Sequence, residues 1–150
     1  MVDISMSKKA EEDFLFAGRI LRLATISKDG SPHVVPIWYL YENGKIYIHT
    51  EANSVKARNI QRNNSVAMCV DIGEFYYDLK NIILKGKAKI LEDEDLATRI
   101  AEKIQVKYFG SCSHPQASEY LSKKANNVVI EIGPSKKRRS QDYSLLRKHS

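Results

Sequence analysis

The most chemically suggestive stretch of the chain is NSVKARNIQRNN, which begins at Asn53 and directly follows the strand-like run GKIYIHT. Asn53 or Ser54 can cap a helix over most of this stretch, because a side-chain oxygen there accepts hydrogen bonds from the free amides of the first turn. A helix N-terminus attracts anions, so Lys56 in that turn and the Thr50 hydroxyl beside it predict a phosphate cradle. On spacing alone, a solvated basic surface helix is an equally good interpretation.

The other residues that could do chemistry are scattered. Histidine is a residue type that can donate a proton near neutral pH, which makes His33 and His49 candidates. A histidine on a strand more often has a hydrogen-bonded structural role, so neither is assigned as catalytic. Cys69 lies in a strand-like run where a small apolar residue is expected. Cys112 and His114 have no second pair of ligands at metal spacing, so no metal is predicted. The sequence also has no GxGxxG motif, so a built-in dinucleotide-binding fold is not predicted.

Length and composition predict one domain over residues 1–150, because 150 residues with 43% hydrophobic and 28% charged side chains can bury a core. The apolar runs are too short to span a membrane, and the N-terminus has no apolar signal core, so a cytoplasmic location is expected. Much of the net charge of +6 comes from a basic C-terminal tail that starts at about residue 134. No aromatic residues interleave with Lys136 to Arg139, so nucleic acid is not expected as a partner.

Hydrophobic periodicity predicts the elements that position these residues. Helices are expected at 7–18, 54–63 and 93–110, and strands at 19–27, 32–41, 45–50, 64–72, 81–92 and 126–134. The Asp29-Gly30 pair and the turn from Glu42 to Gly44 are hairpin signals, so the first three strands should form a meander.

The order of these elements favours a mainly β fold with α-helices (α+β). We predict a six-stranded antiparallel split β-barrel of Greek-key type with flanking helices, and a β-sandwich is the alternative. Along the second strand, inward-pointing Val35, Ile37 and Tyr39 would leave Val34, Trp38 and Leu40 on the outer face, and the opposite parity also leaves large apolar groups outside. Such an apolar strip predicts a dimer interface or a flat ligand.

The residues from Phe14 to Asp71 resemble the pyridoxamine 5'-phosphate oxidase-like, FMN-binding split-barrel family, and the later strands to Gly133 resemble it more weakly. The resemblance rests on an Ala-Thr strand, an Asp-Gly turn followed by Pro-His, a Pro-x-Trp strand and a Ser-x-Lys-x-x-Asn helix start, all in this order. As an ordered set these elements are specific to the family.

The resemblance implies a homodimer that holds two flavins in clefts between its subunits. The strand from His33 to Trp38 would contact the isoalloxazine ring, and the phosphate would bind at the next strand's end and at Lys56. An aromatic loop around Tyr77 could reach the partner's flavin. The full set of implied cofactor-binding residues is His33, Val34, Val35, Pro36, Ile37, Trp38, His49, Thr50, Val55, Lys56, Asn59 and Tyr77.

By this resemblance the chain is expected to be an FMN-binding oxidoreductase or flavin reductase-like protein that acts on a small-molecule substrate or reductant. Val55 replaces the arginine that true pyridoxamine phosphate oxidases carry before the lysine, and the tail lacks their Trp and Arg, so that specific activity is not expected. Two alternatives remain open: a reductase that uses an 8-hydroxy-5-deazaflavin coenzyme, and a non-catalytic flavin or haem carrier.

Overall fold

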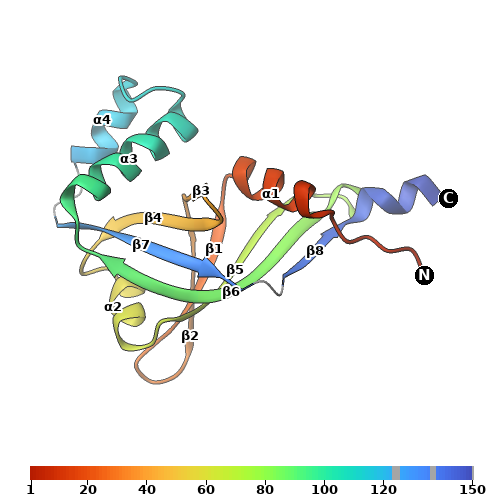
Figure 1. The fold of residues 1–150 in the computed structure, drawn as a ribbon, viewed down its shortest axis with the longest axis horizontal. Helices are drawn as coiled ribbons and strands as arrows, with labels where there is room; N and C mark the ends of the chain where they lie inside the picture. The colour runs from red at the N-terminus through yellow and green to blue at the C-terminus, as the bar shows by residue number, and fades with distance from the viewer. Residues whose placement is uncertain (123–125, 136–137, 150) are drawn as a thin grey trace.

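The computed structural model describes residues 1–122, 126–135 and 138–149, and Figure 1 shows how their helices and strands are arranged. The helices are α1 (Lys8–Ala17), α2 (Val55–Arg62), α3 (Glu94–Phe109) and α4 (Pro115–Ser122), with short 3-10 helices η1 (Tyr76–Asp78) and η2 (Tyr143–His149). The strands are β1 (Leu21–Ile26), β2 (Pro32–Ile37), β3 (Leu40–Glu42), β4 (Lys45–Glu51), β5 (Ser65–Ile72), β6 (Lys80–Leu91), β7 (Asn127–Pro134) and β8 (Arg139–Asp142).

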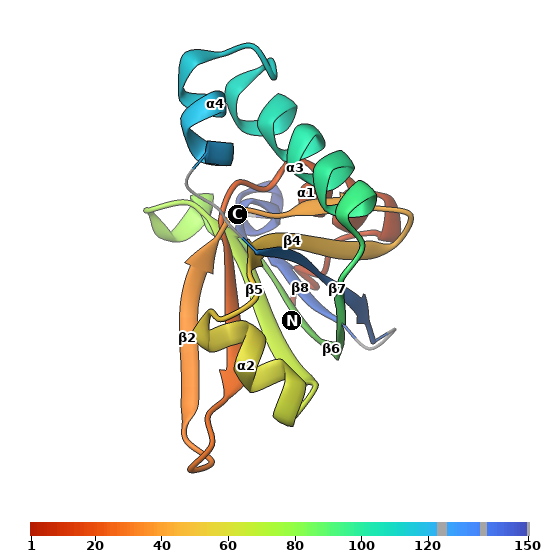
Figure 2. The ribbon, with the colours of Figure 1, turned by 90° about the vertical axis from the view of Figure 1, so that its left-hand side faces the viewer.

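The strands form one antiparallel sheet in the order β2-β1-β5-β6-β7-β4-β3, and β8 pairs with β6. The sheet curls into a half-closed barrel, with α3 and α4 on one side and α2 at the open end (Figure 2). This confirms the predicted split barrel with flanking helices, although the described residues form a sheet of eight strands where six were expected. The two extra strands come from a break in the predicted second strand and from the C-terminal segment.

The barrel is split because its edge strands do not pair with each other along the described chain. Strand β2 is hydrogen-bonded to β1 alone. Strand β4 pairs with β7 along its length, but β3 covers its other edge only from Lys45 to Tyr47. The edge of β4 from Ile48 to Thr50 therefore has no sheet partner. Two open strand edges, from β2 and from β4, flank the split.

Two hydrophobic clusters hold the elements together. The first fills the barrel and takes one face of every long strand, including Ile46 and Ile48 of β4. The second lies between α3 and the outer face of the sheet, where Ile100 and Ile104 pack near Leu40 and Trp38. The buried stripe of α3 is the one that its helical spacing predicts.

The predicted second strand, 32–41, is wrong as a single strand. It breaks after Ile37, and β3 begins at Leu40, so the first three strands do not form a meander. Of the two parities left open for its side chains, the structure has the one with Val35 and Ile37 inside. Val35 and Ile37 pack against the barrel cluster, whereas Trp38 and Leu40 belong to the cluster under α3. Helix α3 thus covers part of the outer apolar strip and leaves Val34, which is 60% exposed.

The C-terminal residues form ordered structure where a basic tail was expected. Arg139 begins β8, and the side chain of Arg138 is paired with Glu11 and Glu12 of α1. Lys136 and Lys137 lie outside the described residues. Helix α4 was not predicted, because its sequence has neither a clear apolar stripe nor a strong N-cap.

Candidate functional site

A pocket of about 410 Å³ opens at the split in the barrel. Pro36, Ile37 and Trp38 line it from the end of β2, and Ile48, His49 and Thr50 line it from the open edge of β4. Lys56 of α2 and Ile20, just before β1, complete the lining. Six of the residues predicted from the sequence therefore meet here: Pro36, Ile37, Trp38, His49, Thr50 and Lys56. A pocket of about 300–1,000 Å³ suits a small organic ligand.

The polar end of the pocket is built by the start of α2. Ser54 is the N-cap, and its hydroxyl oxygen accepts a hydrogen bond from the backbone N–H of Ala57 at 3.3 Å. The Thr50 hydroxyl donates to the Ser54 hydroxyl at 3.5 Å, so the end of β4 is tied to the helix start. This arrangement places two hydroxyls, a helix N-terminus and Lys56 at one end of the pocket, which suits an anion.

Lys56 lies half-buried in this wall. Burial lowers the pKa of its ammonium group, and the nearby Glu51 carboxylate acts in the opposite direction. Among the described residues, no carboxylate forms an ion pair with Lys56. A bound anion stabilises a half-buried cation that has no such partner, so Lys56 is the charged group of this pocket best placed to hold one.

The other residues expected from β2 lie along the same strand but further from the pocket. Val34 points to solvent, and Val35 packs on the barrel cluster. His33 pairs in register with Thr25 of β1, and its Nδ1 is buried without a hydrogen-bond partner in the described chain. His33, Val34 and Val35 thus flank the pocket without lining it.

His49 is buried, with 6% of its surface exposed, and it contributes to two pockets. The second pocket has a volume of about 630 Å³ and lies between the ends of β4 and β7 and the first turns of α3. Its lining includes Glu92, Glu94 and Thr98. His49 therefore stands between the Lys56 pocket and this larger hollow.

Three further expected residues lie outside the pocket. Asn59 is 2% exposed; its amide donates to the Thr25 hydroxyl at 3.0 Å and its carbonyl oxygen accepts from Arg62 at 2.7 Å, so it fastens α2 to β1. Val55 is exposed in the first turn of α2. Tyr77 lies in η1, in the connection between β5 and β6, and does not line the pocket of this chain.

Sequence reasoning missed Ile20 and Ile48 as lining residues. Isoleucine is an ordinary core residue, so neither position stood out as a binding residue in the sequence. Ile48 packs in the barrel cluster while it also borders the split, and Ile20 stands in the link between α1 and β1. The signal that could have found them is their position beside an unpaired strand edge, which depends on the strand order.

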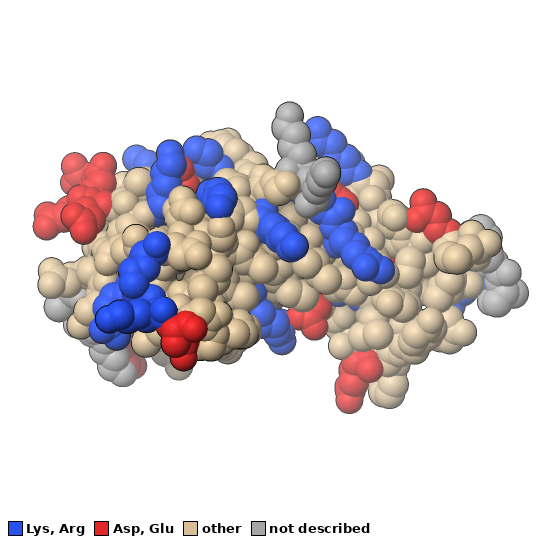
Figure 3. Space-filling model, turned by 90° about the horizontal axis from the view of Figure 1, so that it is seen from below, with Lys and Arg blue, Asp and Glu red and all other residues tan. Residues whose placement is uncertain are grey.

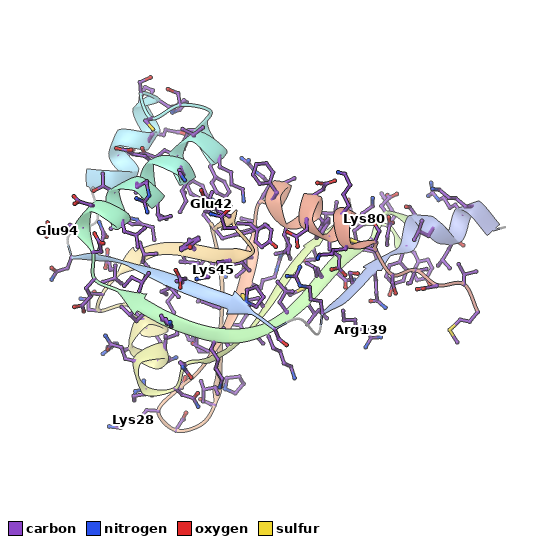
Figure 4. The ribbon with its side chains drawn as sticks, viewed as in Figure 1. Lys28, Glu42, Lys45, Lys80, Glu94 and Arg139 are labelled. Atoms are coloured by element: carbon purple, nitrogen blue, oxygen red, sulfur yellow. The ribbon has the colours of Figure 1, made fainter. Side chains whose placement is uncertain are left out.

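Among the described Lys and Arg side chains, Lys56 alone lines this pocket. Lys and Arg side chains are scattered over the face in Figure 3, with acidic groups among them. In Figure 4, Lys80 and Arg139 lie toward the end of the molecule that carries the termini, away from α2, and Lys28 is at the tip of the β1–β2 hairpin. Lys80 is also paired with Asp142 at 3.3 Å.

The described part of the chain has neither a metal cluster nor a membrane-spanning helix. No cluster of three or more His, Cys, Asp or Glu side chains there could hold a metal ion. None of its helices is both long and apolar enough to cross a membrane.

Comparison with known structures places the fold among solved proteins. A conserved hypothetical protein of Mycobacterium tuberculosis is 29% identical, with a TM-score of 0.86, and the match covers 98% of this chain and 91% of that one. A structure described as an F420 reductase is 26% identical with a TM-score of 0.65, over 85% of this chain and 94% of the other. The haem storage protein HutZ of Vibrio cholerae is 15% identical with a TM-score of 0.71, over 89% and 94%, and shows the shared fold alone.

No match was found among curated protein sequences. The family described as pyridoxamine 5'-phosphate oxidase matches residues 7–139, which include the split, the Lys56 pocket and seven of the eight strands in full. The ordered motifs of the sequence and the split barrel agree with this match. The protein therefore belongs to the pyridoxamine 5'-phosphate oxidase family.

Proposed function

We propose that the chain is an FMN-dependent oxidoreductase or flavin reductase-like protein, that residues 1–150 act as one domain, and that the flavin occupies the Lys56 pocket at a homodimer interface. The observation that carries the proposal is the half-buried Lys56 beside the Thr50 hydroxyl and the α2 N-terminus. FMN has a phosphate at one end and a flat ring at the other. The pocket has the matching polarity, because its cationic end gives way to apolar Ile37, Trp38 and Ile48.

The residues present fit this cofactor, and each has a defined task. A bound flavin supplies transfer of a hydride or of electrons. Lys56, Thr50 and the first amides of α2 would hold the phosphate. The open backbone edges of β2 and β4 offer N–H and C=O groups for the polar edge of the ring, and Trp38 and Ile48 exclude water. This chemistry does not require a protein acid or base, so none is assigned.

A deazaflavin coenzyme is the second candidate. The observation in its favour is the 26% identity to a structure described as an F420 reductase, over 85% of the chain. An 8-hydroxy-5-deazaflavin also combines a flat ring with a phosphate, so the same pocket could take it. A non-catalytic flavin or haem carrier is the third candidate, and only the shared fold of a haem storage protein points to haem.

The test is a set of binding titrations on cofactor-free protein with FMN, riboflavin, the deazaflavin coenzyme and haemin. Riboflavin is the matched ligand, because it has the ring of FMN without the phosphate. In Lys56→Ala, FMN affinity should fall about ten- to a hundredfold, the usual effect of losing a hydrogen bond to a charged group, while riboflavin affinity stays the same. Arg58→Ala is the matched variant, since it removes an exposed cation from the same helix and should change neither affinity.

Each ligand gives a distinct answer. A wild-type protein that is colourless as purified and does not bind added FMN would overturn the FMN proposal. Tighter binding of the deazaflavin or of haemin would then identify the second or third candidate. If the wild type binds FMN and riboflavin equally well, the ring can still bind in the pocket but the phosphate assignment of Lys56 is wrong.

A further inference from the structure

Trp38, the sole tryptophan of the chain, lines the pocket. Its ring is also one layer of a stack of side chains from α3 and from the link before β1. Its ring lies on the Tyr108 ring with a centroid distance of 4.4 Å and an interplanar angle of 9°. The guanidinium carbon of Arg19 lies 4.5 Å from the centroid of the same Tyr108 ring. Phe109 contacts the Trp38 ring edge-on at 5.4 Å. The last turn of α3 thus surrounds Trp38 with aromatic contacts.

The Tyr108 hydroxyl adds two hydrogen bonds to this stack. It accepts from the backbone N–H of Tyr39 at 3.1 Å and donates to the carbonyl oxygen of Arg19 at 2.7 Å. Tyr39 directly follows Trp38, and Arg19 directly precedes Ile20, so both bonds go to backbone next to a residue that lines the pocket. One tyrosine on α3 therefore fixes two separate parts of the pocket wall.

Lys107 strengthens the same connection. Its ammonium group donates to the Tyr39 carbonyl at 2.9 Å and lies 3.8 Å from the centroid of the Tyr39 ring. Both backbone polar groups of Tyr39 are therefore satisfied by α3 side chains at the point where β2 and β3 separate. In return, Arg19 donates to the Lys107 carbonyl at 2.8 Å, which satisfies a free carbonyl of the last helical turn.

We propose that Tyr108, with Arg19 stacked behind it, is a positioning residue that fixes the Trp38 ring in the wall of the cofactor pocket. Trp38 lies outside the regular pairing of both β2 and β3, so the sheet alone does not set its orientation. Parallel stacking and the backbone hydrogen bond to Tyr39 restrict both the ring and the chain that carries it. The role of Trp38 toward a ligand rests on the proposed flavin function. The effect of Tyr108 on the Trp38 ring can be tested in protein without any ligand.

The first experiment measures the intrinsic fluorescence of Trp38 in cofactor-free protein. Tyr108→Leu should shift the emission to longer wavelength and increase quenching by acrylamide, because the ring loses its cover. Tyr108→Phe keeps the ring and should restore most of the wild-type signal. Tyr47→Leu is the matched control: it makes the same substitution in the same hydrophobic cluster, on β4, and should lower stability without changing the emission of Trp38.

The second experiment measures FMN affinity in the same variants. Tyr108→Leu should weaken binding about two- to tenfold, the range expected for losing one aromatic pair, and Tyr108→Phe should weaken it less. If Tyr108→Leu does not fold, Arg19→Gln replaces it, because Arg19 is exposed and its loss removes the outer layer of the stack.

The outcomes separate this inference from the proposed function. Unchanged Trp38 emission in Tyr108→Leu, or in Arg19→Gln if that variant is used, would overturn the positioning role whether or not flavin binds. A shifted emission with unchanged FMN affinity would overturn it as well, because the position of Trp38 would then not matter to the pocket. Failure of the wild type to bind FMN would overturn the proposed function, while the emission would still report on the stack.

Discussion

Lys56 and Lys107 are both half-buried, and they differ in what surrounds them. Lys56 lies at the polar end of the pocket, with the Glu51 carboxylate near enough to offset part of its burial. Lys107 donates to a carbonyl and lies over an aromatic ring. Burial, with a smaller effect of Arg19, lowers the pKa of Lys107 to about 8. Lys107 thus has its partners within the chain, whereas the surroundings of Lys56 favour an added anion.

The lowered pKa of Lys107 predicts that the free energy of unfolding depends on pH. The folded state binds the Lys107 proton with a pKa of about 8, and the unfolded chain with the ordinary value of 10.5. The free energy of unfolding contributed by this group therefore rises with pH between these two values. Denaturant unfolding of the wild type and of Lys107→Met at pH 7.5 and at about pH 10 should show the wild type gaining stability relative to the variant. A difference that is the same at both pH values would contradict the prediction.

At the scale of elements, the start of α2 combines a structural role with a binding role. Ser7 caps α1 and Ser54 caps α2, each by accepting a hydrogen bond from the N–H three residues later. Their cap geometries are therefore alike, but only Ser54 also accepts from a residue of the pocket, Thr50. The two serines form a natural pair for separating stability from binding.

Replacing either serine with alanine should lower the free energy of unfolding by about 1 kcal/mol, the typical cost of a lost N-cap. Only Ser54→Ala should also weaken FMN binding, because it frees Thr50 and disturbs the amides that face the phosphate. Thermal or denaturant unfolding measures the first effect, and fluorescence titration with FMN measures the second. Equal FMN affinities in Ser7→Ala and Ser54→Ala would argue against a phosphate at this helix start.

The elements that were predicted from the sequence are those with local signals. The three expected helices have their caps in the sequence, such as Ser54, Asp93 and the left-handed Gly110 with φ of 81°. The break at Trp38 has no such signal, because the side chain that binds the backbone of Tyr39 there is 69 residues away. Strand β8 is formed by pairing with the distant strand β6. Its own sequence is basic and carries no strand signal, so it was predicted to be a tail.

The same distinction applies to the site. Thr50 and Lys56 are close in sequence, on a strand and a helix that follow one another, so their meeting was predictable. The pocket itself is formed by strand order, which leaves the edges of β2 and β4 facing the split. That order arises from pairings between distant segments, and a periodic pattern in one segment does not contain it. Ile20 and Ile48 were missed for this reason.

At the scale of the whole molecule, several large apolar side chains stay exposed in the isolated chain. Val34 lies on β2, the strand whose end lines the pocket, and Phe75, Tyr76 and Tyr77 extend from the β5–β6 connection. Exposed apolar groups of this size often mark protein interfaces. The proposed homodimer would cover such a surface and could bring Tyr77 of one copy to the pocket of the other, which a single chain does not do.

If the flavin site lies at the proposed homodimer interface, association of the two chains and flavin binding should be lost together. Sedimentation should give the wild type a mass of twice the 17.1 kDa of one chain. Val34→Asp adds a charge at an exposed position, so the isolated fold should survive, but a dimer that buries this position should dissociate and FMN affinity should fall with it. Val106→Asp, at an exposed position on α3, is the control and should change neither property. A monomeric wild type with full FMN affinity would show instead that one chain forms the complete site, and the exposed residues of β2 would then need another partner.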